Sequence, residues 1–219
     1  MLDVWLSEML GYPVYNSLIP PESDERSLTC AKVPVSDVGT VQRLTELGFR
    51  LVEVNVQLGA VGHDMGARYT HHKVVFADPC HHQALLKIAE SCFTHSRFHR
   101  DGLTLLRANQ IKREWVRNCL EGRRGLEVLV ALNSYRVTGF LAVGREGNSR
   151  TVDLLGVDSK CQRNGFGRAL LRSFMTLNPG RTLTAGTSLS NVPSLLLYES
   201  CSFKVKSASY VLHLHRGIQ

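Results

Sequence analysis

The 219-residue sequence lacks several patterns that would assign it to other classes of protein. No apolar run is long enough to cross a membrane, and the start, Met1–Trp5, lacks the basic residues and apolar centre of a signal peptide. The six cysteines form no Cys-x-x-Cys pair, which disfavours a zinc ribbon or a disulfide framework. We therefore expect a cytoplasmic protein with reduced thiols and no segment inserted in a membrane.

Long runs of lysine and arginine are also missing, although the net charge is +7. Without such a run or a stripe of alternating basic and aromatic residues, we expect no nucleic-acid partner. The basic excess suits a small polyanionic ligand, and a solvated basic surface is the alternative. The length and the 43% of hydrophobic residues allow one sizeable core, and we expect an N-terminal lobe over 1–65 followed by a larger domain over 66–219.

The most informative stretch is Thr151–Leu171, which has the pattern of a strand, a glycine-bearing turn and a helix. Gly165 and Gly167 allow the backbone to approach a ligand closely. The amides of residues 163–168 would then be unpaired at a helix N-terminus, which is a suitable site for a phosphate or a diphosphate. The stretch has neither the Gly-Lys-Ser/Thr of a P-loop nor the third glycine of a dinucleotide fingerprint. An ordinary strand-to-helix turn remains the alternative.

Hydrophobic periodicity and turn residues predict the other elements. We expect an edge strand at Ala31–Val35, because a proline lies inside it, and two closing strands at Phe203–Val205 and Tyr210–Leu214. The remaining predicted strands are Phe49–Leu58, Tyr69–Phe76, Glu127–Leu132, Val137–Val143 and Arg181–Ala185. The remaining predicted helices are Val38–Leu47, Asp78–Phe93, Gln110–Leu120 and Asn191–Cys201.

This order of elements, together with Gln-x-x-Gly-x-Gly at Gln162–Gly167, resembles the GNAT superfamily of N-acetyltransferases. A second segment strengthens the resemblance, since Asn191 is followed by Tyr198-Glu199 and then by Phe203. The resemblance implies an α/β fold in which helices flank a mixed, mostly antiparallel central sheet, with a small N-terminal α/β lobe beside it. It also implies acetyl-CoA as co-substrate and direct transfer to an amine without an acyl-enzyme.

The same resemblance implies roles for individual residues. Those expected to bind the cofactor are Leu155, Gly156, Val157, Gln162, Arg163, Asn164, Gly165, Phe166, Gly167, Arg168, Asn191 and Ser194. Tyr198 is expected to protonate the departing thiolate, and a packed helix tyrosine is the alternative. Glu53 is expected to deprotonate the amine, and Asp153 is a second candidate for this base. An exposed strand carboxylate is the alternative for Glu53.

Four further segments resemble those members of the superfamily that acetylate a dTDP-linked 4-amino-4,6-dideoxyhexose for surface polysaccharide. They are Leu47–Glu53, Ser96–Phe98, Glu114–Asn118 and Thr187–Asn191. Arg97 and Phe98 are accordingly expected to contact the sugar nucleotide, although Arg97 could equally be a solvated loop residue. The alternatives are another small amine or a protein N-terminus as acceptor, or a non-catalytic acyl-CoA-binding module. A homodimer remains open, since closing strands in this fold often meet a second subunit.

Histidines and Cys161 suggest two further kinds of chemistry, both of which the pattern disfavours. His71-His72, His81-His82 and the pair His95/His99 lack a carboxylate or thiol at ligand spacing, so we expect no metal. Cys161 lies beside the glycine-bearing turn, but no histidine and asparagine pattern supports a nucleophile, and we expect a packed or exposed thiol.

Overall fold

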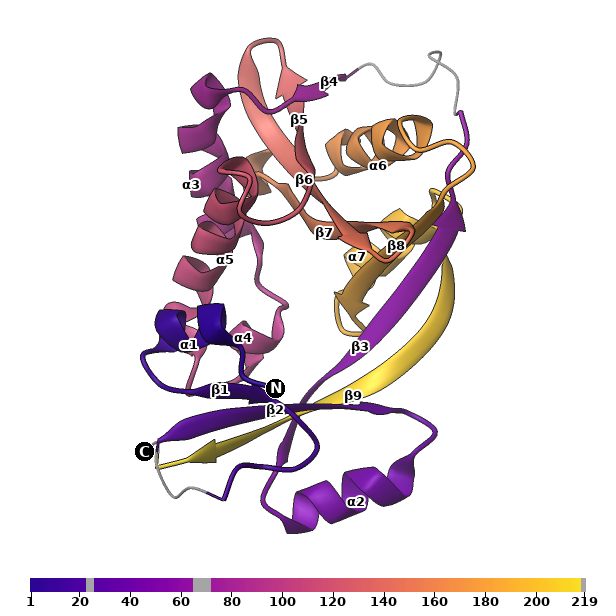
Figure 1. Cartoon of the computed structure of the whole chain (residues 1–219). Coiled ribbons are helices and arrows are strands. Elements are labelled where there is room, and N and C mark those ends of the chain that lie inside the picture. Colours follow the sequence, from indigo (N-terminus) through magenta and orange to yellow (C-terminus); the bar gives the residue numbers. More distant parts are fainter. Residues whose placement is uncertain (23–25, 65–71, 218–219) are drawn as a thin grey trace.

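The computed structural model describes residues 1–22, 26–64 and 72–217, and a sheet of nine strands runs through them in the order β1-β2-β9-β3-β8-β7-β6-β5-β4 (Figure 1). Two neighbouring pairs, β1/β2 and β7/β8, are parallel, and the other pairs are antiparallel. The predicted mixed, mostly antiparallel sheet is therefore confirmed. No helix among the described residues is long and apolar enough to span a membrane.

The strands are β1 (Val14–Asn16), β2 (Ser27–Pro34), β3 (Arg50–Val61), β4 (Lys73–Phe76), β5 (Glu127–Asn133), β6 (Arg136–Glu146), β7 (Ser149–Val157), β8 (Thr182–Ser188) and β9 (Lys204–Arg216). The helices are α1 (Val4–Leu10), α2 (Val38–Glu46), α3 (His82–Cys92), α4 (Arg97–Arg100), α5 (Leu105–Leu120), α6 (Phe166–Thr176) and α7 (Val192–Glu199), with short 3-10 turns at η2 (Pro79–His81) and η3 (Ser159–Cys161).

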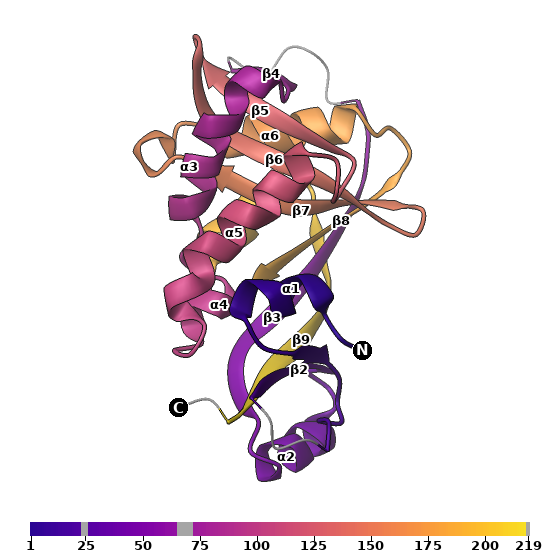
Figure 2. The same ribbon diagram turned by 60° about the vertical axis from the view of Figure 1, so that its left-hand side comes forward.

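Alternating side chains divide the sheet into two packed faces. Phe140 and Ala142 of β6 pack against α3 and α5, whereas Leu141 and Val143 pack against α6 on the opposite face. Figure 2 shows α3 and α5 along one side of the sheet, with α4 near the end of α5. Smaller cores lie under α1 and under α2. All six cysteines are free.

The structure confirms the predicted edge and corrects the closing strands. The stretch predicted as an edge is the end of β2. Strand β1 pairs only with Leu28–Cys30, so from Ala31 onward β2 has β9 alone of the described strands beside it. Pro34 is tolerated because it is the last residue of the strand, where one missing N–H costs little. The two predicted closing strands are one strand, β9, because Ser207–Ser209 continues the pairing with β3.

Other boundaries differ by a few residues. The helix predicted from Asp78 begins as a 3-10 turn that the Asp78 side chain caps, and α3 follows it. Helix α5 starts at Leu105, before the predicted Gln110. Arg97, for which a solvated loop position was the alternative, is the first residue of α4. Of the strand predicted from Tyr69, residues 69–71 lie outside the described residues, as do residues 66–71 of the predicted second domain. The strands before and after residue 65 share one sheet, and the two-domain division stays a prediction.

Candidate active site

A cavity of about 950 Å³ opens between the turn that precedes α6, the end of β7 and the helices α4 and α5. Its lining joins the predicted cofactor residues to both predicted bases and to Arg97 and Phe98. Of the predicted site residues, Asn164 is not part of the lining. The cavity therefore brings together residues that lie more than 140 positions apart in the sequence.

The turn before α6 lines this cavity, and its peptide N–H groups are unpaired within the described part of the chain. Asp158 caps the preceding 3-10 turn by accepting a hydrogen bond from the Lys160 N–H, at 3.0 Å. Arg163 (φ 65°) and Gly165 (φ 86°) then adopt left-handed backbone conformations that reverse the chain into α6. Among the described residues, none accepts a hydrogen bond from the backbone N–H groups of 162–168. The positive end of α6 and these free donors make a site for an anion.

His72 supports this turn from behind, which the sequence analysis missed. Its Nε2 lies 2.7 Å from the carbonyl oxygen of Asn164, and its ring packs against Phe166 with centroids 4.0 Å apart. Asn164 thus contributes to the shape of the turn through its backbone. Sequence reasoning had no signal for this contact, because His72 and Asn164 are 92 residues apart.

Beyond Val152, β7 and β8 diverge. Their pairing covers only Arg150–Val152 on β7, so Leu155, Gly156 and Val157 line the cavity without β8 beside them. Gly156 is needed for packing as well, because a Cβ there would lie 2.7 Å from Cys92 Sγ. An extended ligand could pair with the free edge of β7 in the way that a strand would.

Helix α7 contributes a further part of the cavity lining. Asn191 is its N-cap, with Oδ1 accepting a hydrogen bond from the Ser194 N–H at 3.3 Å. Tyr198 is 5% exposed and packs against Phe203, but it also borders the cavity. Burial raises the pKa of Tyr198 above its ordinary value, so the phenol keeps its proton at neutral pH. Tyr198 can therefore act as a proton donor.

Glu53 reaches the cavity from β3 at an irregularity in the strand pairing. The register between β3 and β9 shifts between Leu51 and Glu53, and such bulges re-aim side chains beside functional sites. Glu53 Oε2 is buried, and no described residue donates a hydrogen bond to it. Burial raises the pKa of Glu53, whereas the nearby Arg97 opposes the shift. A buried carboxylate with a raised pKa is a suitable base for an ammonium group.

Asp153 has a different environment, although it lines the same cavity. Its Oδ2 accepts hydrogen bonds from Trp115 Nε1 and from Arg124 Nε, each at 2.9 Å. These two donors engage the carboxylate oxygen that an acceptor amine would have to reach. Of the two predicted bases, Glu53 has the geometry better suited to that role.

Arg97 and Phe98 come from α4, which lies where the cavity meets β3. The Arg97 guanidinium lies 4.9 Å from the centre of the Phe98 ring, and Phe98 is buried. Lys32 and Lys112 add two cations to the lining that the sequence analysis missed. A second cavity of about 420 Å³ adjoins this end and shares Lys32, Arg97 and Val211 with the first.

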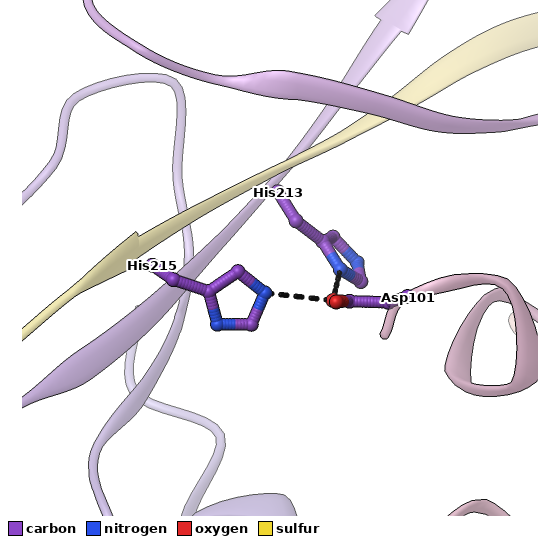
Figure 3. Close-up of side chains that lie close together, drawn as sticks. All are labelled: Asp101, His213 and His215. Carbon is purple, nitrogen blue, oxygen red and sulfur yellow. Dashed lines mark hydrogen bonds and ion pairs between the residues drawn. The ribbon is translucent and has the colours of Figure 1, made fainter. Parts of the chain in front are cut away.

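Three residues outside the cavity have the composition of a metal site (Figure 3). Asp101 Oδ2 lies 2.6 Å from His213 Nδ1 and 2.7 Å from His215 Nε2. These distances are those of N–H···O hydrogen bonds, which place a proton on each facing nitrogen. The other ring nitrogens, His213 Nε2 and His215 Nδ1, have no hydrogen-bond partner among the described residues. In a metal site, the ring nitrogen that does not bind the metal usually donates a hydrogen bond. We therefore describe the group as a hydrogen-bonded clamp between β9 and the segment after α4.

Replacing Asp101 with asparagine should destabilise the fold by about 3 kcal/mol at pH 7, because the buried imidazole of His213 and the partly buried one of His215 would lose a charged acceptor. Burial alone would raise the pKa of Asp101, but the hydrogen bonds from His213 and His215 outweigh it and hold that pKa well below its usual range. Burial lowers the pKa of His213, and the hydrogen bond to Asp101, which acts in the opposite direction, offsets this only in part. Both groups bind protons less readily in the folded state than in the unfolded state. The contribution of His213 is therefore present near neutral pH and is lost as pH falls below about 6.5, whereas that of Asp101 persists until pH falls below about 3.8.

Urea unfolding of the wild type and of Asp101→Asn between pH 8 and pH 5 measures this effect. The difference in unfolding free energy between the two proteins should be smallest at pH 8 and should widen toward pH 5, because the Asp101 carboxylate favours protonation of His213 in the fold and asparagine does not. A gap that is constant with pH would show that the clamp does not titrate in this way.

The comparisons with known proteins agree with this fold. Residues 83–203 match the sequence model described as the acetyltransferase (GNAT) family. The spore coat polysaccharide biosynthesis protein SpsD of Bacillus subtilis (strain 168) is 31% identical over 144 residues, which are 64% of this chain and 50% of SpsD. This chain thus spans about half the length of that curated relative.

Two solved structures share the fold at low sequence identity. A GCN5-related N-acetyltransferase from Sphaerobacter thermophilus superposes with a TM-score of 0.61 at 14% identity, over 88% of this chain and 61% of that one. A conserved protein of unknown function from Staphylococcus epidermidis ATCC 12228 superposes with a TM-score of 0.67 at 13% identity, over 86% of this chain and 73% of that one. At these identities the likeness concerns the fold alone.

Proposed function

Because the chain belongs to the GNAT family of acetyltransferases, we propose that it transfers the acetyl group of acetyl-CoA directly to the amine of a sugar nucleotide. The acceptor we favour is a dTDP-linked 4-amino-4,6-dideoxyhexose, whose acetylation would serve surface polysaccharide synthesis. The observation that carries the proposal is the single cavity that has free N–H groups at 162–168 at one end and Glu53 at the other.

The residues divide into a cofactor end and an acceptor end. The N–H groups of 162–168 bind the diphosphate of the donor, and the free edge of β7 at Leu155–Val157 holds its pantetheine arm and polarises the thioester oxygen. Glu53 takes a proton from the acceptor ammonium, directly or through a water, so that a neutral amine attacks. The attack forms the C–N bond, and the C–S bond then breaks. Tyr198 gives its proton to the departing thiolate and regains one as the amide nitrogen loses its second proton.

Charge and shape at the acceptor end support a nucleotide over a peptide. Lys32, Arg97 and Lys112 line this end, and the adjoining cavity of about 420 Å³ offers room for the nucleoside. Tyr198 is the one tyrosine in the lining formed by the described residues, whereas an open groove with several tyrosines would favour a peptide. SpsD is named for spore coat polysaccharide biosynthesis, which agrees with a sugar acceptor.

The test is an assay of the purified protein with acetyl-CoA and dTDP-4-amino-4,6-dideoxy-D-galactose, with release of the CoA thiol as the signal. We expect release that requires both substrates and stops when the 4-amino group is replaced by a hydroxyl. If CoA is released with simple amines or a peptide N-terminus but not with the sugar nucleotide, the acceptor is another small amine or a protein N-terminus. CoA binding without turnover on any amine would indicate a non-catalytic acyl-CoA-binding module.

A further inference from the structure

Lys112 lies in the wall of the acceptor end, on the apolar side of α5. The residue is 8% exposed and belongs to the lining of the cavity. Three aromatic rings surround its ammonium group, with Nζ lying 4.8 Å from the ring centre of Trp115, 5.2 Å from that of Phe93 and 5.8 Å from that of Phe98. The faces of aromatic rings attract a cation, so this cage holds the ammonium at a fixed position.

No described residue pairs with this ammonium group through a hydrogen bond or an ion pair within 4.0 Å. The nearby carboxylate of Asp153 is engaged by Trp115 and Arg124. A buried charge without a partner costs free energy, and the cation–π contacts replace only part of the lost hydration. Three N–H donors thus remain for a ligand in the cavity.

Like charges gather around Lys112 at this end. Arg97 repels Lys112 and, after burial, is the largest cause that lowers the pKa of Lys112 to about 8. Glu53 attracts it but forms no contact within 4.0 Å. Cations that repel one another in the wall of one cavity are stabilised when an anion binds between them.

We propose that Lys112, together with Arg97, binds a phosphate of the acceptor, which makes Lys112 a specificity-determining residue of the acceptor site. The inference rests on the proposed function and deepens it. Arg97 lines both cavities, so a phosphate that bridges Arg97 and Lys112 would lie between the reacting sugar and its nucleoside. A neutral amine of the same size would leave the ammonium unpaired and would bind more weakly.

The test is calorimetric titration of the CoA-saturated protein with dTDP. Bound CoA already occupies the N–H groups of 162–168, so dTDP added afterwards can bind only at the acceptor end. Lys112→Met keeps the length of the side chain and removes its charge, and Lys87→Met is the matched control, because Lys87 is an exposed residue of α3 outside the lining. Thermal unfolding should show Lys112→Met to be at least as stable as the wild type, since it removes an unpaired buried charge. Lys112→Gln is the second variant if the methionine variant does not fold.

We expect Lys112→Met to bind dTDP roughly 10- to 100-fold more weakly, as the loss of a charge-assisted contact predicts, and CoA about equally well. The inference would be overturned if the wild type and Lys112→Met bind dTDP equally well, or if the variant binds CoA more weakly and dTDP as well as the wild type does. If the wild type binds inorganic pyrophosphate through Lys112 but neither binds dTDP nor acetylates the sugar nucleotide, the phosphate site stands and the proposed acceptor fails. If neither dTDP nor pyrophosphate binds, the inference is wrong, and the turnover assay decides the proposed function separately.

Discussion

Replacing Glu53 with glutamine should lower kcat/KM for acetyl transfer by roughly 10²- to 10⁴-fold, the usual contribution of a positioned general base. The amide keeps the size of the side chain but cannot take a proton from the acceptor ammonium. The fold should not suffer, because Glu53 Oε2 has no described hydrogen-bond donor and its buried charge is a cost in the wild type. The unfolding temperature of Glu53→Gln should therefore equal or exceed that of the wild type.

The pH profile gives this prediction a second measurement. Glu53 must be ionised to act as a base, so activity should fall as pH decreases through its pKa. Because burial raises that pKa above the ordinary 4.5, the acidic limb should lie at a higher pH than for a solvated glutamate. The residual activity of Glu53→Gln should lack that limb.

The matched control for Glu53 is Glu46→Gln at the exposed end of α2, which should leave kcat/KM unchanged. Steady-state kinetics with acetyl-CoA and the accepted amine supply all the values. Activity of Glu53→Gln within about threefold of the wild type would assign the base to another group. Asp153 would then be the next candidate, although Trp115 and Arg124 already hold its carboxylate.

The parts of the site that could be predicted from the sequence are those that depend on near neighbours in the chain. Gly165 is predicted to allow an unusual turn, and it adopts a φ of 86° at the start of α6. Val152, Leu154 and Val157 predict the strand that leads into the turn, and β7 contains them. Local backbone chemistry decides such features, so a single sequence is sufficient to find them.

The parts that could not be predicted depend on contacts across the sheet. The clamp joins Asp101 to His213 and His215, which are 112 and 114 residues away, and no local pattern indicates such a pairing. β9 was predicted as two strands because Ser207–Ser209 has little β-propensity, whereas its two neighbours in the sheet hold the segment extended.

Lys112 had a signal that the sequence analysis did not use. It lies four positions from both Ala108 and Val116, which are buried, so it falls on the apolar stripe of α5. A lysine on such a stripe either extends its ammonium to solvent or is held by a partner, and only the structure shows the three rings around it. The family match at residues 83–203 includes Lys112 but begins well after Glu53, so the family model covers the acceptor end only in part.

Replacing Gly165 with aspartate should weaken CoA binding far more than replacing it with asparagine. Both side chains tolerate the left-handed conformation that Gly165 adopts, and both place a Cβ 3.3 Å from His72 Nε2. The two variants therefore share their steric and backbone costs and differ by one negative charge beside the free N–H groups of 162–168. At a distance of about 6 Å and an effective dielectric constant near 20, that charge opposes each negative charge of a diphosphate by about 3 kcal/mol.

Because the turn is exposed, solvent and salt screen this repulsion, and we expect CoA affinity of the aspartate variant to be roughly 10- to 100-fold below that of the asparagine variant. Calorimetry with CoA measures the ratio without any acetyl transfer, and the ratio should shrink as the salt concentration rises. Equal affinities of the two variants at low salt would show that the diphosphate does not bind at 162–168. The free N–H groups would then be solvated in the complex, and the assignment of the cofactor end of the cavity would be wrong.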